Sequence, residues 1–408
     1  MNELERNIFF NTGYQIIGKI LTSLLGFISL SLIARSLGIL LFGQYSLIFV
    51  YLSLSGIFAD FGLVTLLIRE IASKRGSKKY LKGIFSLRLL LNLLIFLVAG
   101  VFTYFLPFQQ TFKLSLILGF ASNVILSLSS VFLGVFQAGL RFKLVASSQI
   151  ITNLIILIFV FWGYWQGKDL LYFIMATLLG NLFGFLFILK KGYFSPFKLF
   201  ILDKKLFFRI IKDAWPIGLG AIVTTFYLKI DSIVLSFFYN PSFNQDLGIY
   251  SSAYKIFEVI GVFIGFFKTT TFPVIASKLN KKNFYLIYQK LIRDSLLIGL
   301  LATGCLFLMS EMLINIFSRD FVVATSSLKI LSLALSTRVV SGIWLSVGVA
   351  GGKQKELFFV SIAAFIFNLL LNLLIIPRYS FIGASWVTVF TQGFITLANL
   401  WVASMVIK

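Results

Sequence analysis

Apolar stretches of about twenty residues recur along the whole chain, and each is long enough to cross the hydrocarbon core of a bilayer as a helix. Residues 83–105 and 145–165 are two examples. The 408-residue sequence is 59% hydrophobic and only 12% charged, whereas soluble domains average about 25% charged residues. These features predict an all-α polytopic membrane protein and exclude an ordinary water-soluble globule.

The apolar pattern predicts twelve transmembrane helices. The first of them is too long for a cleavable signal peptide and has no small-residue cleavage site at its end, so we expect it to be retained. The expected spans are 10–33, 42–66, 83–105, 114–137, 145–165, 170–189, 214–238, 248–272, 290–310, 325–349, 357–377 and 382–406.

Lysine and arginine concentrate in every second loop, chiefly at 74–82, 190–212 and 278–282, and the alternate loops hold few cations. Cytoplasmic loops of membrane proteins carry this excess of positive charge, so both termini are expected in the cytoplasm. The formal net charge of +22 is therefore explained by cationic loops on one side of the lipid bilayer. We expect no nucleic-acid partner.

The two halves of the sequence resemble each other. Residues 42–61 align without gaps on 247–266, which pairs Gly43 with Gly248. Because each half holds six spans, both enter the membrane from the same face, as parallel repeats do. The expected architecture is two six-helix lobes around a central cavity. It comprises an N-terminal lobe at 1–190, a basic cytoplasmic connector at 191–212 and a C-terminal lobe at 213–408.

Polar side chains recur at helical spacing within several spans. Gln15, Lys19 and Thr22 share one face of the first span, and Arg88 and Asn92 lie one turn apart in the third. Polar stripes on many helices favour a hydrated cavity over isolated packing groups. The residues expected to line it are Gln15, Thr22, Asn92, Asn181 and Thr225.

The seventh span contains the stretch FYLKIDSIVLSFF, in which Lys229 and Asp231 interrupt an apolar run. Two residues apart on a helix, they point to different sides and cannot pair with each other. Each therefore needs a partner from another helix or from solvent. In the eighth span Lys255 and Glu258 are three residues apart and can pair, so a purely structural ion pair is an open alternative for them.

Cations outnumber anions inside the spans. The expected cations of a substrate path are Lys19, Arg88, Lys229, Lys255 and Arg338, and the anions are Asp60, Asp231 and Glu258. A surplus of buried positive charge suits an anionic cargo such as a phosphate. The sequence has no histidine and one cysteine, Cys305, so we expect no metal site. Enzyme signatures are missing, and catalytic residues are not expected.

Three stretches carry a resemblance to a known family. They are LIARSLGILLFGQYSL with the following ADFGL, then WPIGLGAIVTTFYLKIDSIVLS with LGIYSSAYKIFEVI, and finally IPRYSFIGASWVTVFTQ. Together they resemble the polysaccharide-repeat flippases, including O-antigen flippases, of the multidrug/oligosaccharidyl-lipid/polysaccharide exporter superfamily. The resemblance spans nearly the whole chain.

This resemblance implies a transporter of the bacterial or archaeal cytoplasmic membrane that works by alternating access. The implied cargo is an undecaprenyl-diphosphate-linked oligosaccharide, a polyprenyl-diphosphate lipid, moved from the inner to the outer leaflet for O-antigen, capsule or exopolysaccharide synthesis. A glycan polymerase and a chain-length regulator are candidate partners. No cofactor is expected. Asp60, Asp231 and Glu258 are candidates to bind a coupling proton or Na⁺, or to act as charge partners of the cations.

Two alternatives stay open. A cation-coupled multidrug exporter of the same superfamily would share the fold, although a basic interior disfavours cationic drugs. A membrane-embedded glycan polymerase would need a large outer loop rich in catalytic residues, whereas the predicted outer loops are all short.

Overall fold

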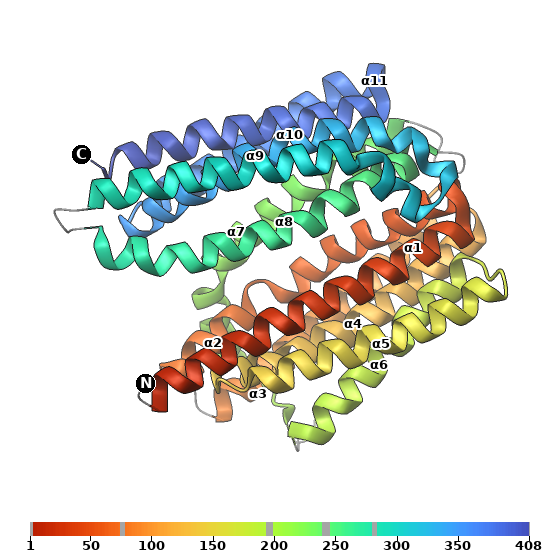
Figure 1. Ribbon diagram of the computed structural model, residues 1–408. Coiled ribbons are helices and arrows are strands. Elements are labelled where there is room, and N and C mark those ends of the chain that lie inside the picture. The colour runs from red at the N-terminus through yellow and green to blue at the C-terminus, as the bar shows by residue number, and fades with distance from the viewer. Residues whose placement is uncertain (1–2, 74–77, 193–198, 239–244, 280–283, 408) are drawn as a thin grey trace. The chain divides into compact units, whose positions relative to one another are not determined.

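The computed structural model describes residues 3–73, 78–192, 199–238, 245–279 and 284–407. All regular secondary structure in these ranges is helical (Figure 1). The helices are α1 (Glu3–Asp60), α2 (Leu63–Ala72), α3 (Lys78–Phe105), α4 (Gln110–Ala138), α5 (Phe142–Trp165), α6 (Leu170–Gly192), α7 (Lys204–Phe238), α8 (Gln245–Lys278), α9 (Phe284–Phe317), the short 3₁₀-helix η2 (Arg319–Val323), α10 (Ala324–Ala350) and α11 (Gln354–Ser404).

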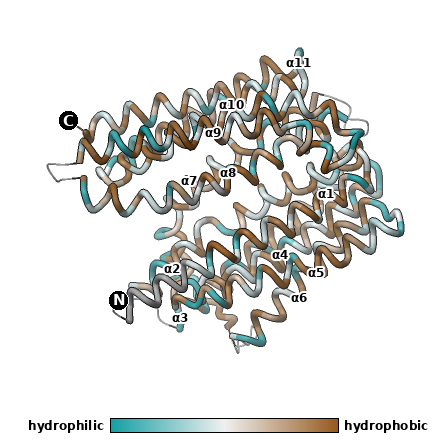
Figure 2. The backbone as a smooth tube through the Cα atoms, viewed as in Figure 1, coloured by the Kyte–Doolittle hydropathy of each residue, from teal (hydrophilic) through white to brown (hydrophobic). Residues whose placement is uncertain are grey.

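Within the described ranges, nine helices are long and apolar enough to cross a membrane. Two of them carry two spans each: α1 kinks at Gly38, where φ is 69°, and α11 kinks at Ser380, where φ is 47°. The eighth predicted span lies on the 34-residue α8, which is not one of these nine helices. Figure 2 shows hydrophobic residues along most of each helix. The prediction of an all-α polytopic membrane protein is confirmed, and each of the twelve predicted spans overlaps one of the helices.

One predicted boundary is wrong. The second span was expected to continue to residue 66, but α1 ends at Asp60 and a short helix starts again at Leu63. Between them Phe61 and Gly62 both have positive φ, a conformation that glycine adopts without strain. The Asp60 carboxylate accepts a hydrogen bond from the Gly62 backbone N–H at 3.2 Å and so supports the turn.

The first compact unit, unit 1, contains Met1–Leu37 and Ile48–Thr225. Its central helix is α4, which packs against α2, α3 and α6, and α6 also packs against α5. Figure 1 shows α4, α5 and α6 running side by side. The first half of α7 also belongs to this unit, through contacts of Ile210 and Ala214 in an apolar core with Phe85 and Phe132.

The second compact unit, unit 2, contains Gly38–Leu47 and Phe226–Lys408. Its central helix is α10, which packs against α8, α9 and α11. Phe42 anchors the short N-terminal segment of the unit. Its ring lies edge-on to the rings of Phe317 and Phe321, with centroid separations of 6.0 and 5.5 Å. A Cβ atom at Gly248 would lie 2.0 Å from the Ile39 carbonyl oxygen, so only glycine permits this approach.

The same polar contact recurs inside each unit. In unit 1 the Asn181 amide of α6 donates to the Ser122 hydroxyl of α4 at 2.9 Å. In unit 2 the Asn399 amide donates to the Ser341 hydroxyl of α10, also at 2.9 Å. These contacts join the fourth span to the sixth and the tenth to the twelfth, which supports the predicted internal repeat.

The predicted domain limits, with a connector at 191–212, stay a prediction. Helix α7 begins at Lys204, inside that segment, and residues 193–198 lie outside the described ranges. Two short pieces of chain belong to the unit of the other half: 38–47 to unit 2 and 213–225 to unit 1.

Candidate functional site

The buried charge of unit 1 is an ion pair between α1 and α3. Arg88 Nη1 lies 2.5 Å from Asp60 Oδ1, and the two side chains are 4% and 26% exposed. Arg88 Nε also donates to the Ser127 hydroxyl of α4 at 2.8 Å, and Asn92 donates to the same hydroxyl at 2.9 Å. The network therefore joins three helices and neutralises both charges within the unit.

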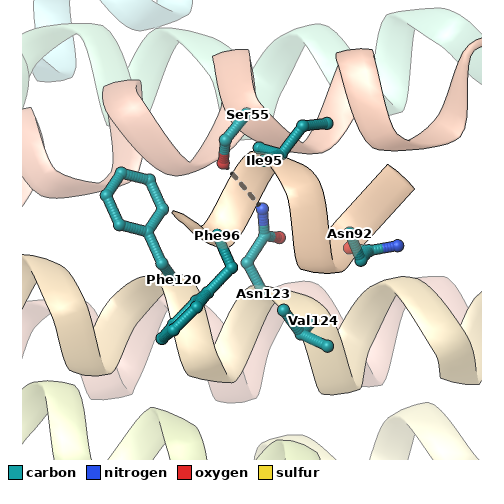
Figure 3. A pocket seen from close by; sticks show the side chains of 7 residues that line it. All are labelled: Ser55, Asn92, Ile95, Phe96, Phe120, Asn123 and Val124. Carbon is teal, nitrogen blue, oxygen red and sulfur yellow. Dashed lines mark hydrogen bonds between the residues drawn. The ribbon is translucent and has the colours of Figure 1, made fainter. Parts of the chain in front are cut away.

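Next to this network is a space of about 10 Å³ between α1, α3 and α4, which is room for about one water molecule. Figure 3 shows Asn123 of α4 pointing toward Ser55 of α1, to which it donates at 3.0 Å. Asn92 lies at one side of the space and Phe120 at the other. This site is too small for a substrate.

Unit 1 also has a larger, open cavity of about 440 Å³ between α1, α4, α5 and α6, lined by both polar and apolar side chains and called the polar cavity below. Three of the residues predicted for the path or the cavity line it: Lys19, Thr22 and Asn181. Arg88 and Asn92 do not, and Gln15 is exposed on α1 outside this lining.

Sequence reasoning missed the contribution of α5 to the cavity. Ser148, Gln149, Thr152 and Asn153 all line it, at the three- and four-residue steps that place side chains on one helix face. That stripe is visible in the sequence and could have predicted the fourth wall.

The charged cluster of unit 2 is built on one carboxylate. Glu258 Oε1 lies 3.0 Å from Lys229 Nζ, and its Oε2 lies 3.0 Å from Lys255 Nζ. The pairing predicted for Lys255 and Glu258 is confirmed, and the partner required for Lys229 comes from another helix, as expected. The Lys229 ammonium also lies over the Tyr254 ring, 5.7 Å from its centroid, a favourable cation–π position.

Arg338 of α10 lies against the same helix, α8. Its guanidinium is 5.5 Å from the centroid of the Phe257 ring. A Cβ atom at Gly261 would lie 2.9 Å from Arg338 Nη1, so the glycine makes room for this packing. Arg338 thus places a further cation against α8, the helix that carries Lys255 and Glu258.

Asp231 is held in a different way. Its side chain is 4% exposed and accepts hydrogen bonds from Tyr250 at 2.8 Å, Asn372 at 2.7 Å and Thr388 at 3.1 Å. In the described part of the chain, no cation lies within ion-pair distance of it. The expected role of Asp231 as a charge partner of a cation therefore finds no cation at ion-pair distance among the described residues.

Further oxygen atoms surround Asp231. The Asn372 amide group donates to Asn368 Oδ1 at 3.0 Å, and Asn368 donates to the Thr391 hydroxyl. Asn372 Oδ1 is buried and has no hydrogen-bond partner among the described residues. These α8 and α11 groups were missed because nothing in their spacing relates them to α7. Thr225 lies earlier on α7 and donates to the Ala221 carbonyl oxygen of its own helix.

Comparison with solved structures identifies the fold. The fold matches the lipid II flippase MurJ in its inward closed conformation with a TM-score of 0.78 and 17% identity, over 96% of this chain and 87% of that one. It also matches the inward-facing conformation of a multidrug resistance MATE family transporter of the MOP superfamily, with a TM-score of 0.69 and 16% identity, over 97% and 93% of the two chains. This protein therefore has the two-lobe fold of MOP-superfamily transporters.

Sequence comparison gives the family. Residues 8–278 match the polysaccharide biosynthesis protein family, and the chain belongs to it. The chain is also 25% identical to the capsular polysaccharide biosynthesis protein CapF of Staphylococcus aureus over 406 residues, which cover 95% of this chain and 97% of CapF. The family resemblance inferred from the sequence motifs is confirmed.

Proposed function

We propose that this protein is a flippase that moves polyprenyl-diphosphate-linked oligosaccharide repeat units from the inner to the outer leaflet of the cytoplasmic membrane. Membership of the polysaccharide biosynthesis family and the likeness to CapF support the glycan part of this proposal. The nine long apolar helices of the described ranges and the MOP fold support transport by alternating access. A glycan polymerase and a chain-length regulator belong to the proposal as partners that receive the cargo.

The observation that carries the proposal is the cation surplus of unit 2. Lys229 and Lys255 share the single carboxylate of Glu258, and Arg338 packs against the same helix. A charge in a membrane span is expensive, about 2.5–3.5 kcal/mol on insertion scales, and usually faces a cavity or a partner. Two lysines that share one carboxylate suit a diphosphate, which brings the missing negative charge and accepts several charge-assisted hydrogen bonds.

The proposed coupling site is Asp231. Its carboxylate is buried among hydroxyl and amide groups, and the unpartnered Asn372 Oδ1 lies in the same cluster. Oxygen ligands of this kind suit a hard cation, and a buried carboxylate without a cation favours uptake of a proton or Na⁺. Binding of that cation would neutralise the α7 charge and favour one of the transport conformations.

A flipping assay tests the proposal. Purified protein in proteoliposomes is supplied with a fluorescent polyprenyl-diphosphate oligosaccharide, and an impermeant quencher reports its transfer between leaflets. The decisive variant replaces Lys229, Lys255 and Glu258 together by Gln. It removes all three charges, leaves none of them unpaired, and approximately retains side-chain volume. We expect flipping to fall about tenfold or more, which corresponds to about 1.4 kcal/mol of lost interaction.

The matched control replaces Lys353 and Glu356 by Gln. This ion pair has the same i,i+3 spacing and 34% and 32% exposed side chains, close to the 32% and 33% of Lys255 and Glu258. The control should flip at the wild-type rate. Uptake of ethidium without transfer of the lipid-linked glycan would overturn the proposal in favour of a drug exporter, and elongation of the glycan would favour a polymerase.

A further inference from the structure

The polar cavity of unit 1 is lined by residues that belong neither to the proposed coupling site nor to the diphosphate cluster. It lies entirely inside one compact unit, between α1, α4, α5 and α6. Its volume of about 440 Å³ is within the range of about 300–1,000 Å³ that is typical of small-molecule sites. The cavity is therefore large enough to hold part of a cargo molecule.

Several polar groups of the cavity have already donated hydrogen atoms to the protein. The hydroxyls of Thr22, Ser129 and Thr177 donate to backbone carbonyl oxygens of their own helices at 2.7–2.8 Å. The Asn153 amide donates to the Gln149 carbonyl oxygen at 2.9 Å, which leaves Asn153 Oδ1 as an acceptor. The walls consequently present lone pairs, and the ligand that they suit is rich in hydroxyl donors, as a sugar is.

Lys19 supplies the one charge of this lining. It is exposed on α1 toward the cavity, and the lining contains no carboxylate. Over the residues whose side chains the structure describes, Lys19 makes no ion pair. Its ammonium is thus free to pair with an anionic group of the ligand, and Gln149 of α5 can donate beside it.

From these features we infer that the unit 1 cavity binds an acidic sugar of the carried glycan, with the Lys19 ammonium on the sugar carboxylate and the acceptor-rich walls on the ring hydroxyls. This inference rests on the proposed function and adds a class of repeat unit, one that contains a hexuronic acid. A single ammonium matches a single carboxylate better than a diphosphate, which carries more charge than one cation neutralises. A cationic drug would meet repulsion from Lys19 and no compensating carboxylate.

Direct binding to the purified protein in detergent tests the site without any need for transport. The probes are a glucuronic-acid-terminated disaccharide, the corresponding neutral glucose-terminated disaccharide, and inorganic pyrophosphate, each followed by saturation-transfer NMR. We expect the acidic disaccharide to bind about tenfold more tightly than the neutral one, as a desolvated charge-assisted contact predicts. Pyrophosphate should not displace it.

Lys19→Gln should reduce the affinity for the acidic disaccharide to that for the neutral one, and Asn153→Ala should weaken both. Lys143→Gln is the control, because Lys143 is an exposed cation at the start of α5 outside the cavity lining. Equal affinity of the wild type for both disaccharides, an unchanged affinity in Lys19→Gln, or displacement by pyrophosphate would overturn the inference.

Transport then separates this inference from the proposed function. Repeat units that differ only in one sugar carboxylate are compared in the flipping assay. Loss of the preference for the acidic unit in Lys19→Gln, with the neutral unit flipped at the wild-type rate, supports the inference. Flipping of both units by the wild type without preference leaves the proposed function standing and removes the acidic-sugar site. If neither unit is flipped, the proposed function fails, and the binding experiment still decides what the cavity recognises.

Discussion

Asp60 of unit 1 and Asp231 of unit 2 both lie within apolar sequence, but their carboxylates have different kinds of partner. Asp60 pairs with the Arg88 guanidinium, whereas the donors to Asp231 among the described residues are uncharged and include Tyr250, Asn372 and Thr388. In the first arrangement the two opposite charges neutralise each other. The second leaves a negative charge in a low-dielectric region, where a proton or a monovalent cation is strongly attracted. The comparison teaches that partner type, more than burial alone, separates a structural carboxylate from a candidate coupling site.

The largest effect is expected from Asp231→Asn. The amide has the shape of the carboxylate but no charge, so it cannot attract the coupling cation. Flipping driven by a proton or Na⁺ gradient should fall by about 10- to 100-fold, within the range of typical coupling free energies. The measurement is initial flipping rate with and without each gradient.

The control for this variant is Asp294→Asn, since Asp294 is 35% exposed in its ion pair with Arg293. A variant Asp231→Asn that still responds to the gradient as the wild type does would break the comparison, because Asp231 would then be as structural as Asp60.

Arg88 gives the second prediction. Removal of one partner from a buried ion pair leaves the other charge uncompensated, so Arg88→Ala should destabilise unit 1 by about 3 kcal/mol. The double variant Asp60→Asn with Arg88→Gln removes both charges and should recover most of that loss. The measurement is thermal unfolding in detergent of Arg88→Ala, of Asp60→Asn and of the double variant.

The same experiment sharpens the role of Arg88. The sequence predicts it as part of the cationic path, whereas the ion pair with Asp60 points to stabilisation. If Arg88→Ala unfolds at the wild-type temperature but no longer flips the glycan, the path role is correct and the stabilising role is wrong.

The membrane class and the location of the spans could be predicted from the sequence, because a run of apolar residues has few alternatives to a transmembrane helix. The pairing of Lys255 with Glu258 was also predictable, since spacing within one helix fixes which side chains can meet. The partners of Asp231 were not, because they come from spans eight, eleven and twelve and depend on tertiary packing.

Two other features lie between these extremes. The polar stripe of α5 from Ser148 to Asn153 has the same helical spacing as the stripe of the first span, so the fourth cavity wall could have been predicted. The end of α1 at Asp60 depends on positive φ at Phe61 and Gly62. A single glycine in an apolar helix does not by itself predict such a turn, because membrane helices often contain glycine.

The smallest effect is expected from Asp203→Asn, which tests a third carboxylate, whose lysine partner is exposed to solvent. Asp203 precedes α7, where it lies 2.9 Å from Lys79 Nζ and accepts from the Leu206 backbone N–H at 3.0 Å. These contacts, with Lys79 first, lower the pKa of Asp203 below its ordinary value. Since the pKa is lower in the folded chain, the ionised carboxylate stabilises the fold above the unfolded pKa of about 3.9, and this contribution is lost as the pH falls through the folded value.

Wild type and Asp203→Asn should therefore differ slightly in unfolding temperature at pH 7, and the difference should vanish in acid. Salt should reduce it as well, because the Lys79 side chain is 62% exposed and its charge is screened. The Asp60–Arg88 pair should keep its contribution in high salt, since its guanidinium is shielded from the solvent. Unfolding scans of Asp203→Asn and Asp60→Asn across pH and ionic strength compare the two pairs directly. A loss at Asp203 as large as that at Asp60 would contradict the argument, because an exposed pair would then stabilise the protein as much as a buried one.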